Sequence, residues 1–171
     1  TAELFFDSVL VPESNLLGEI GNGLHYLKQS LPLERLGIAI AGQASAEAVL
    51  TWTIDYVKER TAFGKRIADF QQPAHQLAHL RTATEVSRAY IDRCVREHNQ
   101  GSLSAIDAAK AKAWATQLQH DVIDAGVQLH GGYGYMIEYP VARAFLDARV
   151  QRIYGGTNEI MMEIVQKDLL R

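Results

Sequence analysis

Hydrophobic positions follow two patterns along this chain, and the change between them divides the sequence. Leu4 to Val11 is rich in Phe, Val and Leu, and Pro12 and several glycines follow it. This pattern predicts a strand followed by a loop. From Leu24 onward, apolar residues recur at helical spacing instead. We therefore predict two regions, residues 1–22 and residues 23–171.

The first helix is predicted to be long. Pro32 suits its first turn, because the N–H group that proline lacks would have no intrahelical partner there. The apolar pattern then continues to a turn at Phe63 and Gly64. It is formed by Leu36, Ala39, Ile40, Ala46, Leu50, Ile54 and Val57.

Further helices follow at short intervals. A second is predicted from about Asp69 to Glu97, ended by the segment 99–101. Ser102 or Ser104 can cap a third, alanine-rich helix that ends at residues 131–132. Two shorter helices are predicted at about 140–150 and 158–170. Helices that alternate in direction and are joined by short connections predict an all-α helical bundle.

Composition excludes several classes of function. A hydrophobic fraction of 47% in 171 residues can supply one core. A net charge of −3 gives no basic face for nucleic acid. No apolar run approaches the roughly 18 residues of a membrane span. The single Cys94 cannot form an internal disulfide and is consistent with a reducing compartment.

A metal site is considered and rejected at the sequence level. His75 and His79 lie four residues apart, which places them on one helix face where a metal could bind. No adjacent glutamate or third ligand completes the pattern. We therefore expect ordinary surface histidines and no metal.

Ordered motifs carry a more specific signal. They are R-T-A-F-G-K-R-I-A-D-F-Q (60–71), V-Q-L-H-G-G-Y-G-Y (127–135), E-Y-P-V-A-R-A-F-L-D-A-R (138–149) and R-V-Q-R-I-Y-G-G-T-N-E-I (149–160). Together they resemble the acyl-CoA dehydrogenases, flavoenzymes that desaturate acyl thioesters. Residues 1–22 resemble the end of that family's middle β domain and its linker, and residues 23–171 its C-terminal helical domain. The resemblance implies a fragment that lacks the N-terminal helical domain and most of the β domain.

The expected catalytic base is displaced. In most of the family the residue after Ile-Tyr is the catalytic glutamate, but here it is Gly155. The segment L-P-L-E-R-L-G-I-A (31–39) resembles the long-chain and isovaleryl branches, in which the base lies near the start of a long helix. The resemblance thus assigns the base to Glu34, while the backbone N–H of Gly155 still donates to the thioester carbonyl. The alternative is that Glu34 merely complements the helix dipole from the surface.

The resemblance also implies FAD and acyl-CoA contacts. Expected FAD-binding residues are Arg60, Phe63, Gln71, Gln128, Gly132, Thr157 and Glu159, and expected substrate-binding residues are Pro32, Leu33 and Arg35. Arg60 and Gln128 would reach the cofactor of a neighbouring subunit, so a homodimer or homotetramer is expected. A guanidinium suits a diphosphate because of its charge and its fork of donors.

The resemblance implies FAD-dependent conversion of acyl-CoA to trans-2-enoyl-CoA in fatty-acid β-oxidation, with electrons passed to an electron-transfer flavoprotein. The long-chain branch is favoured. An isovaleryl-type enzyme and a non-catalytic helical assembly module are the alternatives. The compartment would be the cytoplasm in a bacterium or the mitochondrial matrix in a eukaryote.

Overall fold

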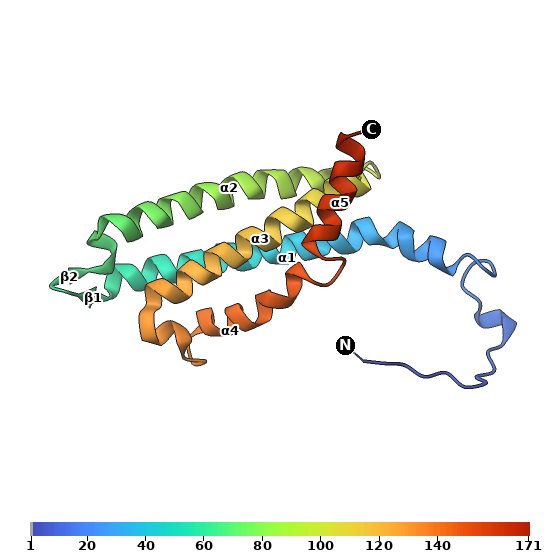
Figure 1. Ribbon diagram of the computed structural model, residues 1–171, viewed down its shortest axis with the longest axis horizontal. Coiled ribbons are helices and arrows are strands. Elements are labelled where there is room, and N and C mark those ends of the chain that lie inside the picture. Colours follow the sequence, from blue (N-terminus) through green and yellow to red (C-terminus); the bar gives the residue numbers. More distant parts are fainter. Residues whose placement is uncertain (1) are drawn as a thin grey trace. The chain divides into compact units, whose positions relative to one another are not determined.

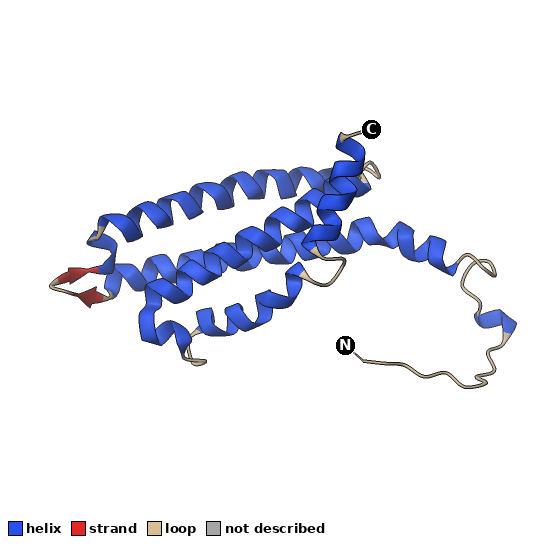
Figure 2. Cartoon of the chain, in the orientation of Figure 1, coloured by secondary structure: helices blue, strands red, loops and turns tan. Residues whose placement is uncertain are grey.

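The computed structural model describes residues 2–171, which form five α-helices and one two-stranded antiparallel sheet (Figures 1 and 2). The α-helices are α1 (Gly23–Glu59), α2 (Gln71–Asn99), α3 (Ala105–His130), α4 (Pro140–Ala148) and α5 (Asn158–Leu169). The strands are β1 (Thr61–Ala62) and β2 (Lys65–Arg66), and 3-10 turns occur at η1 (Glu13–Asn15), η2 (Ile67–Asp69), η3 (Gly131–Tyr135) and η4 (Arg149–Arg152). The all-α bundle predicted from the sequence is confirmed.

The chain divides into two compact units, one up to Ser30 and the other from Leu31 to Arg171. In the first unit, the strand predicted at Leu4–Val11 is not formed. A strand needs a neighbour to pair its backbone groups, and no other segment of residues 2–171 pairs with it. Its large apolar side chains, such as Phe5, are exposed.

Helix α1 begins earlier than predicted. It starts at Gly23, where the Asn22 carbonyl accepts the N–H of Tyr26. Pro32 therefore lies inside the helix and not in its first turn, and Glu34 is likewise an interior residue. The proline removes one intrahelical bond, to the carbonyl of Lys28. The sequence prediction was wrong here because residues 24–31, which contain no glycine or proline, extend the helix backward by more than two turns.

The turn predicted at Phe63 and Gly64 is confirmed. It joins β1 and β2, in which Thr61 pairs with Arg66. Phe63 has φ of 54° and Gly64 has φ of 81°. Two successive residues with positive φ are typical of a tight hairpin whose twist matches its strands.

The two long helices that follow agree with the sequence within about two residues at each end. Ser104 is the cap of α3, and its hydroxyl accepts the N–H of Asp107 at 2.9 Å. At the other end, Gly131 stops the helix with φ of 60°. These are the serine cap and glycine stop expected from the sequence.

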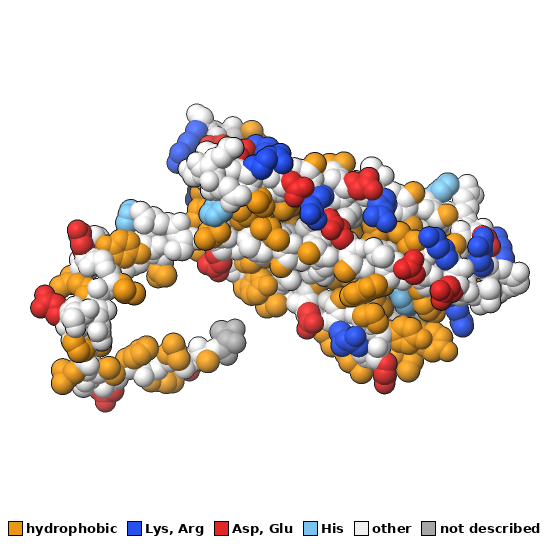
Figure 3. Space-filling view, turned by 180° about the vertical axis from the view of Figure 1, so that it is seen from behind, with side chains coloured by type: hydrophobic (Ala, Val, Ile, Leu, Met, Phe, Trp, Pro, Cys, Tyr) orange, Lys and Arg blue, Asp and Glu red, His pale blue; other side chains and the backbone are white. Residues whose placement is uncertain are grey.

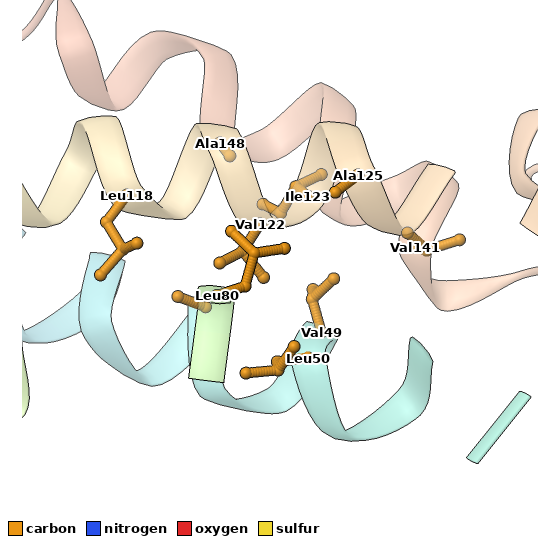
Figure 4. Packing of buried hydrophobic residues seen from close by; sticks show 10 residues of the cluster. Val49, Leu50, Leu80, Leu118, Val122, Ile123, Ala125, Val141 and Ala148 are labelled. Carbon is orange, nitrogen blue, oxygen red and sulfur yellow. The ribbon is translucent and has the colours of Figure 1, made fainter. Parts of the chain in front are cut away.

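Helix α3 is the central element of the bundle. It packs against α2, α4 and α5, and small residues let it approach α1 closely. Figure 4 shows the apolar cluster between these helices: Val49 and Leu50 from α1, Leu80 from α2, Leu118, Val122, Ile123 and Ala125 from α3, and Val141 and Ala148 from α4. From Leu31 onward, α1 is therefore held against α3, and α5 packs on α3 as well.

Replacing Gly126 with Ala is expected to lower the free energy of unfolding by about 1–3 kcal/mol, because an added methyl group overpacks a filled core. A Cβ at Gly126 would lie 2.9 Å from Thr53 Oγ1 and 3.1 Å from Val49 Cγ1. The matched control is Gly37→Ala, where no atom lies within 4 Å of the new Cβ. There the better helix propensity of alanine should raise stability by about 0.5–1 kcal/mol. Urea unfolding of both variants measures this, and equal effects would contradict the close packing of α1 and α3.

Candidate functional site

Glu34 and Gly155 lie together although they are far apart in the sequence. A Cβ built on Gly155 would be 3.9 Å from Oε1 of Glu34, so the carboxylate stands directly beside the Gly155 backbone. Glu34 lies on α1 and is exposed. Gly155 lies in the turn between η4 and α5. The structure thus brings together Glu34, expected from the sequence to be the base, and Gly155, expected to supply a backbone N–H donor.

The backbone of the turn at Gly155 favours glycine. Its φ is 65°, a region that side chains rarely adopt, and a Cβ there would overlap Cδ1 of Ile38. The N–H group of Gly155 makes no hydrogen bond within residues 2–171. The site therefore combines a carboxylate with a neighbouring N–H donor that is free to bind a ligand.

A buried arginine holds the carbonyl side of this turn. Arg35 follows Glu34 on α1 but points inward, and its Nε donates to the Gly155 carbonyl at 3.3 Å. Burial lowers the pKa of Arg35, and the neighbouring Glu34 carboxylate opposes that shift. Pro32 and Leu33 precede this pair on the same helix, and Leu33 is exposed.

Lys112 was missed by sequence reasoning. It lies on α3, is 0% exposed, and donates from Nζ to the Gly156 carbonyl and to Oδ1 of Asn158, both at 2.8 Å. Its sequence signal was available. Lys112 falls at helical spacing with buried Ala108, Ala115 and Gln119, which places it on the apolar face of an alanine-rich helix.

Thr157 and Glu159 lie at the start of α5, next to the same turn. The Thr157 hydroxyl caps the helix by accepting the N–H of Ile160 at 3.3 Å. Hydrogen bonds from its own backbone N–H and from Thr157 hold the pKa of the Glu159 carboxyl below its usual range. Both residues belong to the region of Glu34 and Gly155.

A second region lies at the opposite end of α1. An open groove of about 660 Å³ contains Arg60, Gln128 and Gly132, three of the predicted FAD-binding residues. Arg60 forms no ion pair with any of residues 2–171, and its guanidinium lies 5.5 Å from the centre of the Tyr133 ring. Within these residues Arg60 pairs with neither Glu59 nor Asp69, the two carboxylates near it in the sequence. Asp69 instead pairs with Arg66 at 2.8 Å.

Aromatic rings form one wall of this groove. Tyr56 stacks on the buried His130 with centroids 4.1 Å apart, and Tyr133 stacks on Tyr139 at 5.2 Å. Burial lowers the pKa of His130, which favours its neutral form. In Figure 3, hydrophobic side chains gather at the lower right over this end of the bundle, where η3 leads into α4. In this groove, the Arg60 guanidinium thus lies beside an apolar, aromatic surface.

Two further predicted FAD-binding residues lie outside both the groove and the region of Glu34 and Gly155. Phe63 is 95% exposed at the hairpin tip and meets Phe70 edge to face. Gln71 begins α2 and lines a separate open hollow of about 550 Å³ with His75 and His79. No cluster of three or more His, Cys, Asp or Glu side chains that could hold a metal occurs within residues 2–171.

The two regions are far apart within one chain. Glu34 and Arg60 are 26 positions apart, and since residues 34–59 are helical, a rise of 1.5 Å per residue gives roughly 39 Å. An extended dinucleotide cofactor is shorter than this separation. One such molecule cannot touch both residues of the same chain.

In the described part of the chain, residues 2–171, no helix has the length and apolar character of a membrane span.

Comparisons with known proteins agree with these observations. Residues 21–170 match the family described as acyl-CoA dehydrogenase, C-terminal domain. The mitochondrial long-chain specific acyl-CoA dehydrogenase of Sus scrofa is 51% identical over 170 residues, which are 99% of this chain and 40% of that protein. The caffeyl-CoA reductase–Etf complex subunit CarC of Acetobacterium woodii is 34% identical over 100% of this chain and 45% of its own length.

A solved structure gives the same result. The crystal structure of an acyl-CoA dehydrogenase from Geobacillus kaustophilus superposes with a TM-score of 0.94 at 45% identity, over 96% of this chain and 43% of that one. The chain therefore spans less than half the length of these relatives. By its match over residues 21–170 and its identity to full-length relatives, this chain belongs to the acyl-CoA dehydrogenase family and contains the family's C-terminal helical domain.

Proposed function

We propose that this chain is the C-terminal part of a longer FAD-dependent acyl-CoA dehydrogenase of the long-chain type, which forms trans-2-enoyl-CoA. The carrying observation is the Glu34 carboxylate beside the free N–H of Gly155. The 51% identity to a long-chain specific relative supports the substrate class over the isovaleryl alternative. Glu34 is the proposed base.

The chemistry requires both groups. The proton alpha to a thioester is weakly acidic, so its removal needs a positioned base and a donor for the negative charge that develops on the carbonyl oxygen. Glu34 takes the proton, and Gly155 N–H donates to that oxygen. Because the donor is a backbone group, it is retained although the side chain usual at this position is absent.

The groove fits a diphosphate-bearing cofactor. Arg60 offers a guanidinium without an ion pair among residues 2–171, and space is open beside Gly131 and Gly132, since nothing lies within 4 Å of a Cβ on either. Arg60, Gln128 and Gly132 would hold the diphosphate and adenosine portion of FAD. When bound, the flavin supplies the hydride acceptor that no side chain offers.

The remaining predicted contacts complete this proposal. Phe63 and Gln71 would meet FAD from the hairpin and from the start of α2, and Thr157 and Glu159 from the start of α5. Pro32 and Leu33 would contact the acyl-CoA, and Arg35 would be directed toward the pantetheine arm of that substrate. The Nε of Arg35 would continue to donate to the Gly155 carbonyl. A homodimer or homotetramer follows from cofactor contacts made across subunits.

Electron-transfer flavoprotein is the proposed electron acceptor, and the name of the CarC relative places that protein in an Etf complex. Relatives include a mitochondrial protein and bacterial ones. We therefore propose the mitochondrial matrix for a eukaryotic source and the cytoplasm for a bacterial one.

The test is turnover of the longer protein on a series of straight-chain acyl-CoA thioesters and on isovaleryl-CoA. The proposal expects flavin absorbance in the purified protein and the highest kcat/KM on long straight chains. A preference for isovaleryl-CoA would move the protein to the branched-chain alternative. A protein without flavin and without turnover would instead be the non-catalytic assembly module.

A further inference from the structure

Lys112 is a buried cation that is bonded to a single turn. Its two hydrogen bonds go to the carbonyl of Gly156 and to Asn158, which lie on either side of Thr157. It forms no ion pair with any of residues 2–171, and the charged groups that act on it are Glu159 on α5 and Arg35 on α1. Burying a cation in this way is unfavourable unless its donors are used. Here two of its three donors are used, and both anchor the loop beside Glu34.

The turn needs such anchors. Gly155 and Gly156 have φ of 65° and 91°, and a pair of glycines has more backbone freedom than any other pair. Arg35 holds the first carbonyl from α1, and Lys112 holds the second from α3. Losing the Lys112 bond would free the peptide group that carries the Gly156 carbonyl. Rotation of that group would shift the backbone of both glycines and so change the direction of the Gly155 N–H.

We propose that Lys112 is a positioning residue that fixes the Gly155–Gly156 turn, so that the Gly155 N–H keeps its direction beside the Glu34 carboxylate. The proposal rests on the proposed function for its effect on turnover, but not for its effect on the turn. If Lys112 only filled space, a methionine of similar length would serve equally well.

The protonation state of Lys112 supports this role. Burial lowers its pKa from 10.5 to about 8, with Glu159 raising it and Arg35 lowering it further. The ammonium is therefore the main form near neutral pH, and a charged donor makes stronger hydrogen bonds than a neutral amine. Above about pH 8 the charge is lost, and the hold on the Gly156 carbonyl should weaken.

Turnover provides the first test. Lys112→Met in the longer enzyme should lower kcat by about 10- to 100-fold with KM changed much less, since a misplaced transition-state donor affects mainly the chemical step. Lys112→Arg should restore part of kcat. The matched control is Lys110→Met, which makes the same change on the exposed face of α3.

The pH profile separates positioning from a purely structural role. The Lys112 contribution predicts a decline of kcat above about pH 8 in the wild type and in Lys110→Met. Lys112→Arg should not show this decline, because its guanidinium stays charged. A wild-type turnover equal to that of Lys112→Met across the whole pH range would overturn the proposal.

A measurement on the 171-residue chain is independent of activity. In Lys112→Met, the NMR order parameter of the Gly155 amide should fall from the rigid range of about 0.85 toward about 0.6 or lower. In the wild type, the Gly156 carbonyl shift should follow the titration of Lys112, with a midpoint expected near pH 8. This second experiment needs no variant, so it tests the proposal even if Lys112→Met does not fold.

The outcomes of the two arms are distinguishable. An immobile Gly155 amide in folded Lys112→Met, or a Gly156 carbonyl whose shift does not change as Lys112 loses its proton, would overturn the positioning role whatever the enzyme does. Loss of order at Gly155 in a protein without acyl-CoA turnover would support positioning and remove the proposed function instead.

Discussion

Glu34→Gln is expected to lower kcat of the longer enzyme by about 10²–10⁴-fold or more, the usual loss for a general base. Glutamine keeps the shape and hydrogen bonding of the side chain but cannot take a proton at neutral pH. The Gly155 N–H and the anchoring of its carbonyl by Arg35 do not involve the Glu34 side chain. Substrate binding should therefore change much less than turnover.

The matched control is Glu59→Gln, an exposed carboxylate at the far end of the same helix. Its turnover should equal that of the wild type. Steady-state kinetics of both variants on one acyl-CoA measures the difference. If Glu34→Gln kept its turnover within about threefold of wild type, Glu34 could not be the only base, because a general base contributes far more than that.

Moving the carboxylate from position 34 to position 155 is a second test of Glu34 as the base. Glu34→Gly with Gly155→Glu returns the acid to its usual place in the family and should regain part of the activity, with an altered chain-length preference. The structure adds a condition, because a Cβ at Gly155 would overlap Cδ1 of Ile38. We expect the recovery to be larger when Ile38→Ala is added. Equal activity with and without that third change would show that Ile38 moves aside unaided.

Local signals predicted most of the fold. Ser104 caps α3, Gly131 ends it, and Phe63 and Gly64 form the turn, because each depends on residues within a few positions. The start of α1 was misplaced, since Pro32 is typical of a first turn yet lies inside a helix that its preceding residues prolong. The strand at Leu4–Val11 depends on pairing with another segment, which no local pattern can supply.

The candidate site, like the fold, could be predicted from the sequence only in part. Glu34 and Gly155 were paired by resemblance to a family, and in the structure a Cβ built on Gly155 would lie 3.9 Å from Oε1 of Glu34. Lys112 carried a readable signal, a charge on an apolar helical face, but its partners at Gly156 and Asn158 are more than 40 residues away. Periodicity can place a side chain inside a bundle, whereas the group that it meets there depends on how the helices pack.

Arg60 is expected to act on the cofactor of a neighbouring subunit. Its distance from Glu34 along α1, roughly 39 Å, is too long for one flavin to span. Arg60→Ala should leave the stability of the bundle nearly unchanged, because its contact with Tyr133 contributes only about 0.5–1 kcal/mol at an exposed site. FAD retention by the longer oligomer should nevertheless weaken, since a charge-assisted contact is lost.

Two variants control this result. Lys58→Ala removes an exposed cation from the same end of α1 and should retain FAD normally. Arg60→Lys should recover retention only partly, because lysine lacks the planar fork that matches a diphosphate. FAD content after gel filtration measures retention in each variant. Full recovery with lysine would mean that only the charge of Arg60 matters.

Mixed oligomers test the assignment across subunits directly. Arg60→Ala subunits are combined with Glu34→Gln subunits and allowed to exchange. If each site takes Glu34 from one chain and Arg60 from the other, one site of a mixed dimer carries both changes and the other carries neither, so activity should reappear. If exchange is verified by mass and activity stays at the level of the parent variants, Arg60 serves the same site as its own Glu34. That result would also contradict the separation between the two regions, because a single cofactor would then have to reach along the whole length of α1 from residue 34 onward.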